Sequence, residues 1–226
     1  MTRILFTLIL SLSIFFAQAQ SQNFEIGNFK YLEVGGPFKI YFTSGPEYAI
    51  KIDASDKTME KIEVESDGDV LSISINNKGS WKNWGEPTIY LQAPTLHGIE
   101  LGGACQFYTK NVLNSTHLAL EVSGACEFKG ELIVQKLVSE TSGASRMYLV
   151  GKSESATFEV SGASSMNAED FICKSVVVDL SGASNAKING SEKIMAEASG
   201  ASTLRYKGDA PSIIVESSGS STVKKL

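Results

Sequence analysis

The chain has 226 residues, a formal charge of −5 at pH 7 and a hydrophobic fraction of 42%. This length suits one all-β domain with a sizeable core, and the acidic balance argues against nucleic acid as a partner. No block of like charge predicts a disordered tail.

The first residues predict export. Arg3 gives a positive start, residues 4–16 form an apolar run, and Ala17-Gln18-Ala19 is a small-x-small cleavage site. This pattern is typical of a secretory signal peptide, and the run is shorter than the roughly 20 apolar residues of a transmembrane helix. We therefore expect residues 1–19 to be removed, which leaves no membrane span. The mature protein is expected in the periplasm, at the outer membrane or on the cell surface.

Residues 20–95 alternate apolar and polar side chains without repeating a phrase. The stretches 38–43, 48–53, 61–66 and 70–75 show the period of two that predicts strands with one buried face. Turn signals such as Ser44-Gly45-Pro46 separate them. Because the open end of a solenoid exposes unpaired backbone groups, we expect this region to be a β-rich cap that continues directly into residues 96–226.

Residues 96–226 repeat one short phrase, most often Ser-Gly-Ala-Ser, seven times. A period near 20 residues is typical of a solenoid in which each coil packs only against its neighbours. Helical periodicity is absent, so we predict a β-solenoid of seven coils. The reference glycines of the phrase are spaced 21, 19, 19, 20, 18 and 19 residues apart: Gly103, Gly124, Gly143, Gly162, Gly182, Gly200 and Gly219.

Counting from each reference glycine predicts which way the side chains point. Positions −4, −2 and +4 are mostly apolar, as expected for the inward side of short strands. Glycine accepts a positive φ and has no Cβ to collide with the next coil. We therefore interpret the seven glycines as structural corners, not as binding residues.

The exported start, the alternating N-terminal part and the serial Ser-Gly-Ala-Ser phrases together resemble the auto-transporter adhesin head domain (GIN domain) family of bacterial envelope proteins. The resemblance covers roughly residues 24–223. It implies a right-handed single-stranded β-helix. It implies no catalytic residue, because the family has none established.

Position −3 is acidic in every repeat and is predicted to point outward. One interpretation is a strip for cations or a basic ligand; the other is a solvated face that discourages edge aggregation. No Asp-rich loop supplies the converging oxygens of a calcium site. The candidate strip is Glu121, Glu140, Glu159, Asp179 and Glu197, continued by Glu100 and Glu216 at its ends.

Position −5 is predicted to lie on the same outer face and is mostly apolar from the third repeat onward. Outward apolar residues in a row indicate a contact surface, either for a partner or a second copy, or for the N-terminal region. The candidate contact residues are Val138, Val177, Met195 and Ile214.

Position +5 mixes aromatic and basic residues, which either hold an acidic glycan or lipid headgroup or form an ordinary polar outer strand. The residues are Tyr108, Lys129, Tyr148, Asn167, Lys187, Arg205 and Lys224. Trp81 and Trp84 fall on a predicted loop, where they either stack on sugars or fold back onto an apolar end.

Cys105 and Cys126 occupy the same place in the first two repeats. Equivalent positions in stacked parallel strands lie about 4.8 Å apart, whereas the Cβ atoms of a disulfide prefer about 3.8 Å. The sequence leaves open a slightly distorted disulfide or two small residues in a tight column.

The sequence offers no convincing catalytic arrangement. Polysaccharide hydrolysis needs two carboxylates at a set separation, but the repeats supply one acid each in a uniform row. His97 and His117 align with no nucleophile, and Ser184 and Lys187 match a Ser-x-x-Lys motif that works at a helix start. We predict a non-catalytic envelope protein for binding, adhesion or scaffolding, without cofactor or metal. Envelope lipid or glycan binding is the alternative, and a polysaccharide-degrading β-helix is a distant one.

Overall fold

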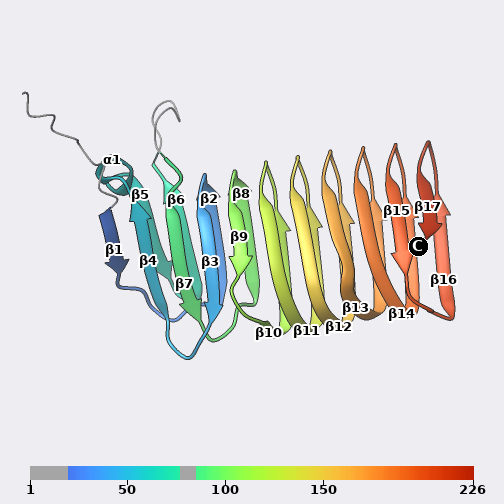
Figure 1. The fold of residues 1–226 in the computed structure, drawn as a ribbon, viewed down its shortest axis with the longest axis horizontal. Coiled ribbons are helices and arrows are strands. Elements are labelled where there is room, and N and C mark those ends of the chain that lie inside the picture. Colours follow the sequence, from blue (N-terminus) through green and yellow to red (C-terminus); the bar gives the residue numbers. More distant parts are fainter. Residues whose placement is uncertain (1–19, 77–84) are drawn as a thin grey trace, which may run out of the picture.

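A computed structural model describes residues 20–76 and 85–226 (Figure 1). The expected signal peptide, Trp81 and Trp84 lie outside the described residues. The described chain forms strands β1 to β17 and one short helix, α1 (Asp56–Met59), so the all-β prediction is confirmed.

The repeat region is a β-solenoid of stacked coils, as predicted. Each strand pairs in parallel with the equivalent strand of the next coil, and the long strands bend to run along more than one side of a coil (Figure 1). The strands are β8 (Gly98–Gly103), β9 (Gln106–Thr109), β10 (Leu113–Val122), β11 (Glu127–Thr141), β12 (Arg146–Val160), β13 (Ser165–Leu180), β14 (Asn185–Ala198), β15 (Thr203–Lys207), β16 (Ser212–Ser217) and β17 (Thr222–Lys225).

The repeated phrase forms the tight corner of each coil. All seven reference glycines have φ between +68° and +85°, a region that L side chains rarely adopt. At successive corners the N–H of Ala125 donates to the carbonyl of Gly103 and that of Ala144 to the carbonyl of Gly124, both at 2.8 Å. The coils approach so closely that a Cβ added to Gly143 would lie 2.5 Å from the carbonyl oxygen of Gly124. Both conformation and space therefore require glycine.

The interior is filled by columns of equivalent side chains. Positions −4, −2 and +4 are buried in the first six coils, as the alternation predicts. Phe107 stacks on Phe128 with ring centroids 5.1 Å apart and on Phe42 at 6.1 Å. In the seventh coil Val215 is 39% exposed, because no further coil in the structure covers it.

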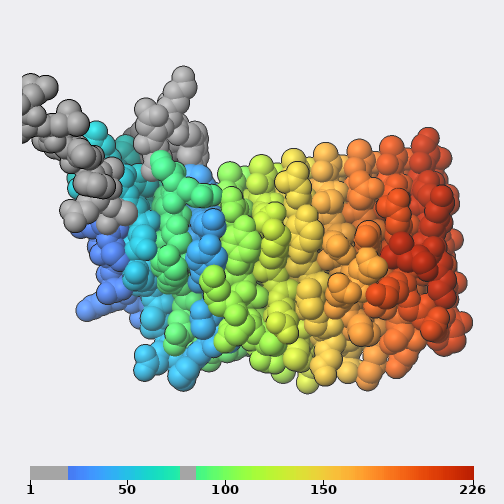
Figure 2. Space-filling view, viewed as in Figure 1, coloured from blue at the N-terminus to red at the C-terminus, as the bar shows by residue number. Residues whose placement is uncertain are grey.

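Two parallel layers come from the N-terminal region, in a non-sequential order. Strands β2 (Tyr31–Gly36) and β3 (Lys39–Ser44) pair with β8 and β9 on one side. On their other side they pair with β6 (Val70–Ile75) and β7 (Thr88–Ala93). Figure 2 shows this order at the surface, where a blue band lies between two green bands. The sequence pattern did not predict that residues 31–44 stack directly on the first repeat.

Antiparallel strands complete this end of the molecule. Strand β4 (Ala49–Ala54) pairs with β7 and with β1 (Gln20–Phe24), while β5 (Ile62–Asp67) pairs with β6. The short helix α1 follows β4 directly. The result is an elongated stack whose outer surface consists of rows of equivalent side chains running along its length (Figures 1 and 2).

Candidate functional site

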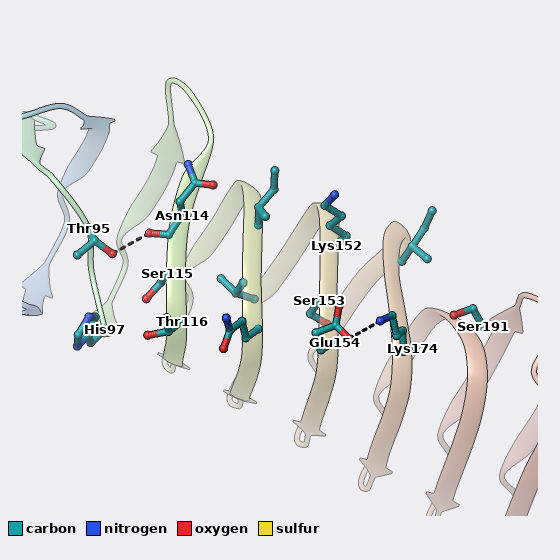
Figure 3. Close-up of a pocket in the computed structure, with 14 residues that line it drawn as sticks. Thr95, His97, Asn114, Ser115, Thr116, Lys152, Ser153, Glu154, Lys174 and Ser191 are labelled. Carbon is teal, nitrogen blue, oxygen red and sulfur yellow. Dashed lines mark hydrogen bonds and ion pairs between the residues drawn. The ribbon is translucent and has the colours of Figure 1, made fainter.

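An open groove with a volume of about 810 Å³ runs across consecutive coils (Figure 3). Its side chains come from equivalent positions on neighbouring strands. Asn114, Ile133, Lys152 and Ile172 are successive partners along one row of the groove. The groove is therefore a product of the repeat, although no repeated motif marks it.

A bend in each coil creates the groove. In β11 the exposed residues Gln135 and Lys136 follow one another between buried Val134 and Leu137, which breaks the strict alternation. The parallel pairing of β10 with β11 likewise passes from Ser115–Val134 to His117–Lys136 without a pair between them. Turning the strand at this point opens the outer surface.

The groove combines aliphatic surface with positive charge. Ile133 is 39% and Ile172 is 53% exposed, and Lys152 lies between them in the same row. Lys174 forms an ion pair with Glu154 at 2.5 Å, and this hydrogen bond raises the pKa of Lys174. Lys152 forms no ion pair with any residue that the structure describes. Its ammonium group is therefore open to a ligand in the groove.

The predicted acidic strip forms one exposed row, and the five candidate acids lie side by side in register. Glu33 of β2 extends the row beyond Glu100, and Ser72 Oγ donates to the Glu33 carboxylate at 2.7 Å. Partial burial raises the pKa of Glu100, and the charges of Glu121 and Glu33 add to this effect. Within the described ranges, no group of three or more His, Cys, Asp or Glu side chains is arranged to hold a metal ion.

The candidate contact residues also form a row on this face. Val138, Val177 and Ile214 remain 41–49% exposed, Met195 is half-buried, and Thr157 interrupts the row. The described part of the N-terminal region, residues 20–76 and 85–95, leaves these side chains exposed. Tyr31 of this part extends the row, because it is the register partner of Gly98. Part of the row lines a shallow hollow of about 230 Å³.

The aromatic and basic row lies on the other side of the glycine corner. It extends past the repeats, because Tyr41 and Tyr90 are the register partners that follow Tyr108. The hydroxyl group of Tyr108 lies 2.9 Å from Oε1 of Gln106 and 2.9 Å from Oε1 of Glu127, and its single proton is shared between these two acceptors. Burial, assisted by the bond to Glu127, raises the pKa of Tyr108 to about 12. Tyr41 and Tyr90 were not predicted for this row because they lie outside the repeated phrase.

The other residues considered from the sequence, the two aligned cysteines and the Ser-x-x-Lys residues, make contacts that are typical of structural positions. Cys105 and Cys126 are buried free thiols, and the N–H of Cys105 donates to Sγ of Cys126 at 3.1 Å. The thiols therefore stand as two small residues in one column. Ser184 is buried, whereas Lys187 points outward to an ion pair with Glu169, so the Ser-x-x-Lys residues do not face one another.

A family model described as "Putative auto-transporter adhesin, head GIN domain" matches residues 28–210. The chain belongs to this family. A comparison with curated proteins gave no match. No helix among residues 20–76 and 85–226 of this GIN-domain protein is long and apolar enough to cross a membrane.

Solved structures share the GIN-domain fold. A putative adhesin from Bacteroides fragilis is 23% identical with a TM-score of 0.89, and the match covers 92% of this chain and 97% of that chain. A putative adhesin from Parabacteroides merdae is 15% identical (TM-score 0.73, 92% and 96% covered). A putative lipid binding protein from Parabacteroides distasonis is 16% identical (TM-score 0.70, 92% and 96% covered). At these identities the likeness establishes the fold.

Proposed function

We propose that this GIN-domain protein is an exported, non-catalytic binding module of the bacterial cell envelope, which acts in adhesion or as a scaffold. The groove of about 810 Å³ carries the proposal, because it is an extended concave surface built from rigid, stacked strands. A solenoid presents such a surface without any loop having to order on binding, which keeps the entropic cost of association low.

The family description and the names of the structural relatives support a binding role. The acidic residues on the described outer face support a non-catalytic role. They form a uniform row along one sheet, whereas glycoside hydrolysis places two carboxylates on opposite sides of the scissile bond.

Envelope lipid or glycan binding is a more specific version of this function. The groove favours an amphiphile, since Ile133 and Ile172 offer aliphatic contact while Lys152 offers a positive charge. One structural relative is named a putative lipid binding protein.

A binding assay with a blocked groove tests the proposal. Residues 20–226 are incubated with vesicles of anionic lipid and with acidic and neutral glycans, and both retention and product release are measured. Gln135→Trp places a large ring at the exposed rim of the groove, while Asn185→Trp adds the same ring at an exposed site on another side of the coil.

We expect retention of at least one ligand, a loss of ten-fold or more in Gln135→Trp, and no change in Asn185→Trp. Equal retention by both variants would remove the groove from the proposed function. Release of a smaller product from any glycan would contradict a non-catalytic role.

A further inference from the structure

One end of the aromatic and basic row gathers three tyrosines that lie far apart in the sequence. Tyr41 lies between Tyr90 and Tyr108 on adjacent parallel strands, with ring centroids 5.7 and 5.6 Å from its neighbours. The three rings therefore form one aromatic row along the length of the molecule, with interplanar angles of 27° and 32°. Tyr90 is 42% exposed.

Lysines are held against these rings. Lys51 is the cross-strand partner of Tyr90, and its Nζ lies 5.1 Å from the ring centroid. Lys110 Nζ lies 3.8 Å from the centroid of Tyr41. A ring attracts a cation through its quadrupole but carries no net charge, so it positions the ammonium group without neutralising it.

The two lysines differ in how much of their charge is compensated. Lys51 lies 3.5 Å from the carboxylate of Asp53, which compensates part of its charge. Lys110 forms no ion pair within residues 20–76 and 85–226. The surface formed by the two lysines, Asp53 and the tyrosines therefore carries a net positive charge, although the whole chain is acidic.

A hollow of about 310 Å³ lies against both lysines and two of the tyrosines. Its volume is at the lower end of the range for small-ligand sites. Polar groups that suit sugar hydroxyls complete its lining, namely the side chains of Asn23, Thr43 and Gln92.

We propose that this hollow binds an anionic saccharide, with a carboxylate or sulfate of the sugar accepting hydrogen bonds from Lys110 and Lys51. The sugar hydroxyls meet the amides of Asn23 and Gln92, and Tyr90 borders the sugar ring. The site is separate from the groove and goes beyond the function proposed for it. Ammonium groups prepositioned on aromatic rings suit an anion, whereas a neutral sugar would leave the charge of Lys110 without a counter-ion and that of Lys51 only partly compensated by Asp53.

The test measures binding of an oligogalacturonate, of its neutral methyl ester and of dextran sulfate to residues 20–226 at low and high salt. Lys51→Gln combined with Lys110→Gln removes two charges at the hollow. Lys187→Gln combined with Lys224→Gln removes two charges from the other end of the same row. Tyr90→Leu removes one ring, and thermal unfolding checks that every variant is folded.

We expect the oligogalacturonate or dextran sulfate to bind, with affinity at least ten-fold weaker in the Lys51/Lys110 variant and within two-fold of the parent in the Lys187/Lys224 variant. Tyr90→Leu should weaken binding, and the methyl ester should not bind. Gln135→Trp should bind like the parent, which separates this site from the groove.

Any one of the following results would overturn the assignment. One is an equal loss of saccharide affinity in the Lys51/Lys110 and Lys187/Lys224 variants, which would indicate diffuse charge attraction along the row. Another is equal binding of the methyl ester, or no binding of either anionic saccharide. The third is binding to vesicles of phosphatidylglycerol, sensitive to Lys51 and Lys110, without binding of the saccharides, which would assign the hollow to a lipid headgroup.

Discussion

Glu33 and Glu100 lie side by side on adjacent parallel strands, although most of the N-terminal region separates them in the sequence. Their pairing extends the acidic row of the repeats, so Glu100 has a carboxylate neighbour on each side, Glu33 and Glu121. At a spacing of about 4.8 Å each such pair repels by roughly 1 kcal/mol in water before salt screening. The row therefore has a cost in stability at neutral pH.

Replacing Glu100 by Gln should stabilise the protein at pH 7 and low salt, by up to about 1 kcal/mol. Partial burial and the two neighbouring charges raise the pKa of Glu100 in the folded state. Between its unfolded and folded pKa values the folded protein binds more protons, so stability increases as pH falls through the folded pKa. Urea unfolding at pH 7 and pH 5 measures both effects.

Glu216→Gln is the matched control, because Glu216 has one acidic neighbour, Glu197, at the end of the row. The increase in the free energy of unfolding should be smaller for Glu216→Gln than for Glu100→Gln. If Glu100→Gln is no more stable than the parent at pH 7 in low salt, the side chains fan apart enough to cancel the repulsion.

A corner glycine should tolerate no side chain. Gly143→Ala places a Cβ 2.5 Å from a carbonyl oxygen in a backbone with φ of +73°, so we expect a loss of more than about 3 kcal/mol. Gly68 also has a positive φ, of +57°, but no atom lies within 4 Å of a Cβ added there. Gly68→Ala should therefore lower the free energy of unfolding by only about 1 kcal/mol. Equal losses in urea unfolding would show that conformation alone, and not coil contact, selects glycine.

The spacing of these glycines made the solenoid predictable, because each coil uses the same corner and packs on an equivalent coil. Residues 31–44 were harder to place: Gly36 is in register with Gly103, but no Ser-Gly-Ala phrase surrounds it. Nothing local specifies that β2 stacks on β8 and not on a strand closer in sequence, since this pairing depends on the shape of the whole stack.

Among the candidate surfaces, too, some follow from the local sequence and others depend on how the whole stack is arranged. The acidic row follows from strict alternation and was placed correctly by counting. The groove depends on the bend at Gln135 and Lys136, where alternation fails, so counting could not find it. Tyr41 and Tyr90 join Tyr108 only through the non-sequential stacking of β3 and β7.

Two valines at position −4 test how far the core extends along the stack. Val178 is 1% exposed and Val215 is 39% exposed, although both are the same residue in the same column. Val178→Ala should cost about 2 kcal/mol through lost burial and a cavity, whereas Val215→Ala should cost well under 1 kcal/mol. A comparable loss at Val215 in urea unfolding would mean that another surface covers the last coil in solution.

The thiols of this GIN-domain protein should be free but unreactive in the native state. Burial raises the pKa of Cys173 to about 11, and the hydrogen bond to Cys126 together with burial raises the pKa of Cys105, whereas the hydrogen bond with Cys105 lowers the pKa of Cys126 to about 7. All three side chains are at most 2% exposed. A thiolate is the reactive form, but burial keeps a reagent away from Cys126 even where its thiol is ionised. A thiol reagent at pH 8 should therefore label no cysteine in the native protein and all three after unfolding without reductant. Labelling of Cys173 alone after unfolding would instead demonstrate a Cys105–Cys126 disulfide.

Cys126→Ser supplies the matched variant for this experiment, because the equivalent Ser145 donates to the carbonyl of Gly124 across the same corner. Its stability should stay within about 1 kcal/mol of the parent, since the hydroxyl can make the same bond to Gly103. Urea unfolding without reductant measures the difference. A loss well above that value would contradict the free-thiol arrangement, because removing a disulfide typically costs about 2–5 kcal/mol.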